Sequence, residues 1–135
     1  MKKKICIVVA NYYPNISKDL INGASIVLNR YGIKNFKKIT VPGVFEIPIL
    51  ITKNIDKYEG FVALGCIIKG KTPHFDLISK STINALMFLS IAYKKPIGNG
   101  IITCLNKKQA LIRSNPNKYD KGGEACRAML SVLNV

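Results

Sequence analysis

The stretch that decides the fold is Gly60–Asp76, which reads GFVALGCIIKGKTPHFD. Its first ten residues are nearly all apolar and include several β-branched side chains. This composition predicts a strand over Gly60–Lys69 that is buried on both faces. Gly70 then ends the strand, and Pro73 suits the first position of a helix. A buried strand that leads directly into a helix is the repeating unit of an α/β protein.

The same stretch also matches the phosphate-loop pattern of nucleotide triphosphatases, G-x-x-x-x-G-K-[ST], over Gly65–Thr72. That loop must curl so that successive backbone N–H groups face the phosphates, whereas Ile67 and Ile68 favour an extended strand. No later apolar run ends in an Asp placed to hold Mg²⁺. We therefore reject the triphosphatase interpretation. A smaller anion site remains at Gly70–Thr72, where a helix start and an ammonium group favour phosphate or carboxylate.

His74 is the only histidine of the chain and falls in the first turn of the predicted helix. A helix N-terminus disfavours imidazolium, so we expect a neutral ring that accepts and returns a proton at pH 7. The alternative is that Thr72 only caps the helix and His74 is only a surface residue. On this motif alone both interpretations stand.

The rest of the chain repeats the alternation of strands and helices. Strands are predicted at Lys4–Ala10, Phe36–Val41, Gly60–Lys69 and Pro96–Leu105. Helices are predicted from Ser17 as cap to Tyr31, from near Phe45, over Pro73–Tyr93, from Asn106, and over Lys121–Leu133. In the long helix the residues expected to face inward are Leu77, Ile78, Ser81, Ala85, Phe88 and Leu89. The predicted fold class is therefore α/β, a three-layer α/β/α, flavodoxin-like arrangement with a four-stranded parallel sheet and helices on both faces.

Length and charge limit the classes of protein that remain. The chain has 135 residues, which predicts a single domain over residues 1–135. Its formal net charge is +14, but 18 of the 21 basic residues are lysines, scattered along the chain. Surfaces that read nucleic acids favour Arg, so we interpret the lysines as a solvated surface and predict no nucleic-acid partner. A nucleic-acid binder stays a minor alternative.

The cysteines and the N-terminus point to a reducing compartment. The cysteines are far apart in the sequence and read as small buried side chains, so we predict neither a disulfide nor a metal site. The apolar run after the basic N-terminus is too short for a signal peptide, and no run of eighteen apolar residues predicts a membrane span. We therefore expect a cytoplasmic protein without a membrane partner. The cysteines are Cys6, Cys66, Cys104 and Cys126.

In parallel sheets of this kind, ligands bind outside the carboxyl ends of the strands. That rule selects Asn11–Tyr13, Pro42–Glu46 and Lys69–His74, together with whatever follows the fourth strand. One edge of the sheet thus gathers aromatic rings, a carboxylate, an anion site and a histidine. We predict a functional site at this edge.

Four motifs at that edge, taken in order, resemble the 6,7-dimethyl-8-ribityllumazine synthase family over nearly the whole chain. Val41–Pro48 is similar to the family pattern V-P-G-x-F-E-I-P, and Ala63–Asp76 to L-G-x-x-I-[RK]-G-x-T-x-H-[FY]-D. Pro96–Thr103 corresponds to the fourth-strand motif. Arg113, followed by Lys121-Gly122, corresponds to R…[ND]-K-G. Coincidence between short patterns does not supply four matches in order.

The resemblance implies the activity. The family condenses 5-amino-6-(D-ribitylamino)uracil with 3,4-dihydroxy-2-butanone 4-phosphate, releasing phosphate and water, in the penultimate step of riboflavin synthesis, with no metal or organic cofactor. The catalytic proton shuttle would be His74. Phosphate binding is implied for Gly70, Lys71, Thr72 and Arg113. Pyrimidine and ribityl binding is implied for Tyr12, Val44, Phe45, Glu46, Cys66, Ile67, Ile68, Asn99 and Lys121.

The resemblance also implies a homo-oligomer with active sites between adjacent subunits of a pentamer, in which Asn99 and Arg113 come from the neighbour. Some members build a 60-subunit shell, and +14 per chain favours the pentamer here. The chain departs from the family at Tyr12-Tyr13, commonly Phe-Asn, and at Asn99, often Phe, which cannot stack on a pyrimidine. The linker Asn115–Asn117 is also atypical.

Plainer interpretations remain beside this one. Phe45 could be only a contact to the core, Glu46 a helix-start acid and Lys121 a solvated lysine. A flavodoxin-like binding module could hold a riboflavin-like ligand without catalysis, although it would need neither His74 nor the anion site. A response-regulator receiver is excluded, because it needs acidic residues after the first strand, where this chain has Asn11 and Tyr12.

Overall fold

A computed structural model of the chain describes residues 3–135. Within these residues the strands form one four-stranded, fully parallel sheet in the order β2-β1-β3-β4. The strands are β1 (Ile5–Ala10), β2 (Lys37–Val41), β3 (Gly60–Ile68) and β4 (Ile97–Cys104). The helices are α1 (Pro14–Arg30), the 3-10 helix η1 (Val44–Glu46), α2 (Ile47–Lys53), α3 (His74–Tyr93), α4 (Lys107–Ser114) and α5 (Lys121–Leu133).

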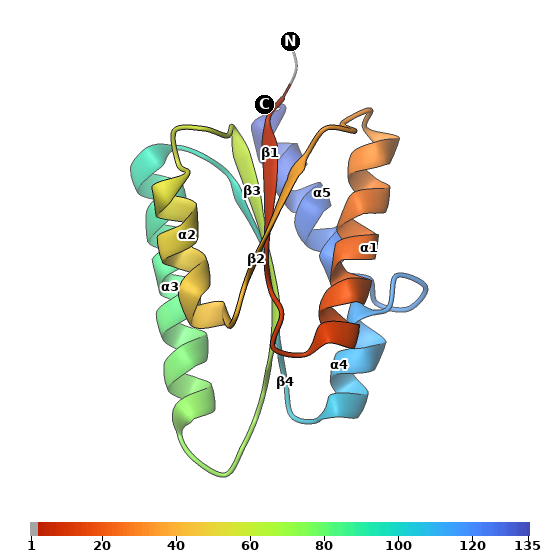
Figure 1. Cartoon of the computed structure of the whole chain (residues 1–135), viewed down its shortest axis with the longest axis vertical. Coiled ribbons are helices and arrows are strands. Elements are labelled where there is room, and N and C mark those ends of the chain that lie inside the picture. The colour runs from red at the N-terminus through yellow and green to blue at the C-terminus, as the bar shows by residue number, and fades with distance from the viewer. Residues whose placement is uncertain (1–2) are drawn as a thin grey trace.

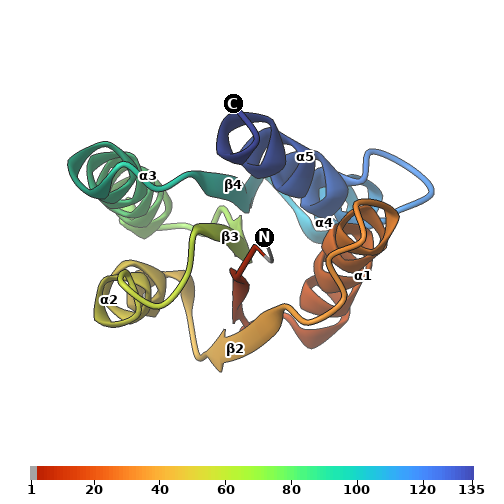
Figure 2. The same cartoon turned by 90° about the horizontal axis from the view of Figure 1, so that it is seen from above.

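The three layers are plain in Figures 1 and 2, where α2 and α3 cover one face of the sheet and α1, α4 and α5 cover the other. All residues of β1 are buried, as are those of β3 up to Ile67, because both strands lie inside the sheet. Alternate side chains feed the two faces: Ile7 belongs to the core cluster under α1 and α5, and Val8 to the cluster under α2 and α3. The predicted fold class is confirmed.

The start of α1 differs from the prediction that Ser17 caps it. The helix begins at Pro14, whose fixed backbone angle suits the first helical position. Ser17 instead lies in the first turn, and its buried hydroxyl donates a hydrogen bond of 2.6 Å to the carbonyl of Ala10. This bond ties the helix to the end of β1, so the prediction of a capping role was wrong.

The inward face of α3 also differs from the prediction. The buried residues are Thr82, Leu86 and Leu89, whereas Leu77 and Phe88 are 64% and 68% exposed. Ser81, predicted to face inward, is exposed as well, and only Ile78, Ala85 and Leu89 of the predicted set are buried or half-buried. The reason is that α3 is apolar around most of its circumference, so spacing alone does not select the buried side.

The apolar residues around α3 also bear on the expectation that the chain has no membrane span. Among the helices of residues 3–135, α3 is long and apolar enough to span a membrane by length and composition, with a mean hydropathy of 1.2. One such helix is weak evidence, because core helices of folded proteins pass the same test. Here α3 packs through Leu86 and Leu89 onto the sheet and beside α2.

Candidate active site

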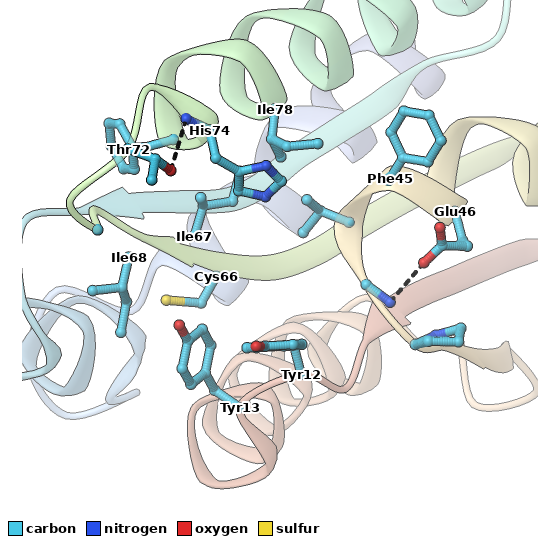
Figure 3. A pocket seen from close by; sticks show the side chains of 15 residues that line it. Tyr12, Tyr13, Phe45, Glu46, Cys66, Ile67, Ile68, Thr72, His74 and Ile78 are labelled. Atoms are coloured by element: carbon cyan, nitrogen blue, oxygen red, sulfur yellow. Dashed lines mark hydrogen bonds between the residues drawn. The ribbon is translucent and has the colours of Figure 1, made fainter.

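A cleft of about 490 Å³ opens at the carboxyl ends of β1 and β3, where the sequence placed the functional edge. Three connections build it: the turn from β1 into α1, the turn from β2 into η1, and the loop from β3 into α3. The predicted residues that line it are Tyr12, Val44, Phe45, Glu46, Cys66, Ile67, Ile68, Gly70, Thr72 and His74. Figure 3 shows how these side chains converge from separate elements.

Aromatic rings dominate the cleft. Tyr12 is 72% exposed and Phe45 is 67% exposed, so both rings present open faces. Tyr12 and Tyr13 form an edge-to-face pair with ring centroids 4.9 Å apart. In Figure 3 the two tyrosines lie on one side of the cleft, and His74 lies across from them. A planar ring-containing ligand suits such a lining, because ring faces stack favourably.

Glu46 supplies the carboxylate of the cleft. Its Oε1 accepts a hydrogen bond of 3.0 Å from the N–H of Gly43, which closes the turn before η1 and fixes the side chain. Within residues 3–135 its other oxygen, Oε2, accepts no hydrogen bond. Glu46 is half-buried at the mouth of the cleft, so this oxygen can accept hydrogen bonds from hydroxyl or N–H groups of a ligand.

His74 is the first residue of α3 and its side chain is exposed to the cleft. Its backbone N–H donates to Thr72 Oγ1 at 3.4 Å, a long bond that holds the loop in a turn before the helix. The helix starts at His74, one residue after the predicted Pro73, and Pro73 takes the N-cap position that the plainer alternative gave to Thr72. Gly70, Thr72 and His74 line the cleft together, whereas Lys71 is exposed beside them.

The floor of the cleft is uncharged. Burial, followed by the neighbouring Cys104, raises the pKa of the Cys66 thiol to about 12. Cys66 is therefore a neutral thiol at physiological pH and not a nucleophile. Within the described chain Cys66 and Cys104 are free and buried, as are Cys6 and Cys126, in agreement with the prediction of small buried side chains.

Three further predicted residues do not line the cleft. Arg113 donates from Nη1 to the carbonyl of Thr103 at 2.8 Å, which anchors the guanidinium at the end of β4. Lys121 begins α5 and pairs with Glu124 at 3.2 Å. Asn99 is exposed on β4, and its side-chain oxygen accepts the N–H of Ile101 at 3.1 Å.

The cleft also contains residues that the sequence did not single out: Tyr13, Phe75 and Ile78. The signal for the last two was available, because residues one and four positions after His74 lie close to it at the start of a helix. The sequence placed Tyr13 at this edge within Asn11–Tyr13 and noted it as a departure from the family pattern, but assigned it no role in the site. Its place in the cleft depends on how the chain turns at Pro14.

The layered fold and its aromatic cleft, with the Gly70–Thr72 loop and a histidine at the strand ends, are those of a small-molecule transferase built on a flavodoxin-like domain. Residues 2–135 match the family described as 6,7-dimethyl-8-ribityllumazine synthase, and the chain belongs to this family.

Similar proteins carry the same name. The protein from Agrobacterium fabrum named 6,7-dimethyl-8-ribityllumazine synthase is 40% identical, and the match covers 99% of this chain and 95% of the relative. The protein from Rhodopseudomonas palustris named 6,7-dimethyl-8-ribityllumazine synthase 1 is 40% identical over 98% of this chain and 85% of the relative. A third, from Methylocella silvestris, is 41% identical over 93% of this chain and 80% of the relative.

Proposed function

We propose that this chain condenses 5-amino-6-(D-ribitylamino)uracil with 3,4-dihydroxy-2-butanone 4-phosphate to form 6,7-dimethyl-8-ribityllumazine, phosphate and water, the penultimate step of riboflavin synthesis. One observation carries the proposal. A single cleft joins open aromatic faces, the carboxylate of Glu46, the Gly70–Thr72 loop and His74. This combination suits a planar pyrimidine with a polyol chain beside a phosphorylated ketose. The reaction needs no metal or organic cofactor.

The residues divide the chemistry between them. Tyr12 and Phe45 offer ring faces to the pyrimidine, and Glu46 accepts hydrogen bonds from the ribityl hydroxyls. The amine of the pyrimidine attacks the ketone and water leaves, which gives an imine. Elimination then expels phosphate, and ring closure releases water. His74 moves protons in these steps, because it is exposed to the cleft beside the anion loop.

The phosphate requires more positive charge than the cleft of one chain holds. Gly70 and Thr72 offer N–H and hydroxyl donors, and Lys71 lies beside them. We propose that Arg113 of a neighbouring subunit completes the site, with Asn99 from the same neighbour. The anchoring of Arg113 to the carbonyl of Thr103 supports this role, because it holds the guanidinium at the carboxyl end of β4.

The assembly that supplies this neighbour is proposed to be a homopentamer. The support is the outer side of α3, where Leu77, Met87, Phe88 and Ile91 are each 60% exposed or more. Exposed apolar surface of this size on a folded domain marks an interface. The charge of +14 per chain favours the pentamer over a 60-subunit shell, because dense packing of like charge is unfavourable. Light scattering distinguishes the two assemblies from each other and from a monomer.

The enzyme proposal is tested by mixing the purified protein with the two substrates and following lumazine fluorescence. Turnover well above the spontaneous rate is expected, and a rate equal to the spontaneous one refutes the proposal. His74→Ala should slow turnover only in part, because positioning of the two substrates supplies much of the rate. Arg113→Ala should raise KM for the phosphate substrate roughly tenfold or more, as expected for a lost charge-assisted hydrogen bond.

The shared site has a sharper test by complementation. His74→Ala and Arg113→Ala chains are co-expressed with different affinity tags, and the mixed assemblies are purified through both tags. If His74 and Arg113 of one site come from different chains, some mixed sites contain both native residues. The specific activity then exceeds the mean of the two parent variants. Activity no higher than that mean contradicts a site shared between subunits.

A cytoplasmic location is also proposed, and the free buried thiols support it, because reducing compartments keep cysteines unpaired. The proposal of small-molecule substrates without a nucleic-acid partner is tested on heparin, where salt-sensitive retention that disappears in a cleft variant would contradict it. A binding module without catalysis would hold a flavin-like ligand in the same cleft and give no lumazine in the fluorescence assay.

A further inference from the structure

Tyr13 lies at the junction of β1 and α1, and hydrogen bonds fix both sides of this junction. Its carbonyl accepts the N–H of Ser17 at 2.9 Å, and the hydroxyl of Ser17 donates to Ala10 at 2.6 Å. The ring packs against Tyr12 and against the core cluster that contains Cys66. A ring held in this way loses little conformational freedom when a ligand binds, so its hydroxyl is preorganised.

The hydroxyl of Tyr13 has no hydrogen-bond partner within residues 3–135, although the side chain is half-buried in the cleft lining. Figure 3 shows the hydroxyl pointing toward the thiol of Cys66 at the floor of the cleft. Burial, followed by the neighbouring Cys66 and Tyr12, raises the pKa of Tyr13 above its ordinary value. The hydroxyl is therefore a neutral donor near pH 7, and an acceptor on a bound ligand would satisfy it.

The surroundings of this hydroxyl favour an uncharged acceptor, because the Arg113 guanidinium, 4.0 Å from Cys104 Sγ, does not line the cleft and donates to the carbonyl of Thr103. Cys66 is a neutral thiol, since burial raises its pKa to about 12, and Ile68 beside it is apolar. The donors suited to an anion, Gly70 and Thr72, belong to the loop after β3, next to His74. Phosphate therefore has its partners at that loop. The corner at Tyr13 suits a carbonyl or hydroxyl oxygen.

We propose that Tyr13 is a specificity-determining residue whose hydroxyl donates a hydrogen bond to an uncharged oxygen of the pyrimidine substrate. This inference rests on the proposed function, which supplies a substrate with ring carbonyl and ribityl hydroxyl oxygens. The ketose phosphate, held at the Gly70–Thr72 loop, does not contact this hydroxyl. Tyr13 thus adds a polar contact to a cleft whose Tyr12 and Phe45 rings recognise shape alone.

The test is Tyr13→Phe, which removes one oxygen and keeps the ring. Loss of one neutral hydrogen bond should raise KM for the pyrimidine substrate roughly 3- to 10-fold, with kcat and KM for the ketose phosphate unchanged. The matched control is Tyr58→Phe, because Tyr58 packs edge-on against Phe61 at 5.8 Å and does not line the cleft. An unchanged pyrimidine KM, or an equal rise in both KM values, overturns the inference.

A substrate change identifies the acceptor. The test replaces the ribityl chain of the pyrimidine substrate with a butyl chain, which removes its hydroxyl groups and keeps the ring carbonyls. If the acceptor is a ribityl hydroxyl, wild type and Tyr13→Phe bind the butyl compound equally. If it is a ring carbonyl, the variant binds both compounds more weakly. Either pattern supports the inference.

Failure of the proposed function is separable from failure of this inference. Wild-type protein that yields no lumazine above the spontaneous rate refutes the function. Calorimetric titration with 5-amino-6-(D-ribitylamino)uracil alone then decides the inference, because it needs no turnover. Weaker binding by Tyr13→Phe than by wild type and Tyr58→Phe supports the role of Tyr13. Equal binding by all three proteins, or no binding by any, overturns it.

Discussion

The two helical layers of this protein differ in how completely one chain buries them. In the layer of α1 and α5, glycines bring backbone against backbone, and a Cβ at Gly122 would collide with the carbonyl of Leu20. In the layer of α2 and α3, only Thr82, Leu86 and Leu89 of the 20 residues of α3 are buried, and Phe88 is 68% exposed. The first layer is closely packed against the sheet, although Val132 of α5 is 62% exposed. The second exposes a row of apolar side chains along α3.

Gly122→Ala tests the close packing of α1 against α5 and should have the largest effect. The new methyl group meets the backbone of Leu20, which cannot rotate away, so α5 must shift from α1. Overpacking of this kind costs about 3 kcal/mol of the free energy of unfolding. Urea denaturation measures it. Gly70→Ala is the control, because a Cβ there meets no atom within 4 Å. An equal loss of stability in both variants would contradict close packing between α1 and α5.

Phe88→Lys tests the layer of α2 and α3, which exposes apolar side chains. The charge should be tolerated in a folded chain, because Phe88 is exposed, but it should break the proposed assembly. Light scattering should then give a monomer mass with an unchanged circular dichroism spectrum. Ile26→Lys on α1, at a residue 45% exposed, should leave the assembly intact. Dissociation of the assembly by Ile26→Lys, or an intact pentamer in Phe88→Lys, would show that the interface does not lie on the layer of α2 and α3.

Alkaline pH gives a third contrast, through Cys126 in α5. Burial raises the pKa of this thiol from 9.0 to about 12, against a smaller opposing effect of Arg127. The unfolded chain therefore loses the proton at lower pH than the folded chain. The stability from the neutral thiol is fully present below pH 9 and is lost as pH rises toward 12. Denaturant titrations from pH 8.5 to 11 should show a smaller fall in stability for Cys126→Ala, and identical slopes would refute the assignment.

Thr82→Val should have the smallest effect, with the opposite sign. Thr82 faces the sheet from α3, and within the described chain its buried hydroxyl has no hydrogen-bond partner. Replacing it with a methyl group of similar size should stabilise the fold by about 1 kcal/mol. Ser17→Ala is the matched opposite, because it removes a buried hydroxyl that is bonded to Ala10 and should destabilise. Thermal melting of both variants compares the signs.

The sequence predicted the two inner strands β1 and β3 well because they are buried on both faces and therefore continuously apolar. It predicted the buried side of α3 poorly for a related reason. A helix that buries one side in its own chain and exposes apolar residues on another, such as Leu77, has no clear periodicity. A pattern of apolar residues therefore does not distinguish the side of α3 that packs on the sheet from the side that stays exposed in one chain.

The sequence also predicted only part of the candidate site. Residues from connections after β1, β2 and β3 meet in the cleft, because parallel strands end at one edge of the sheet. Tyr13 was expected at this edge as part of Asn11–Tyr13 but was assigned no role, because its contribution depends on the local turn into Pro14. Arg113 and Asn99 lie outside the cleft, and strand order in one chain carries no information about a neighbouring subunit.

His74 is the first residue of α3, and the exposed Leu77 follows one turn later on the same helix. The proposed proton-transfer group and the proposed subunit contact thus lie on the same helix. Dilution below the assembly's dissociation constant would remove the subunit contact from the first turns of α3, next to His74. Specific activity should then depend on enzyme concentration, and stock concentration becomes a kinetic variable in every assay.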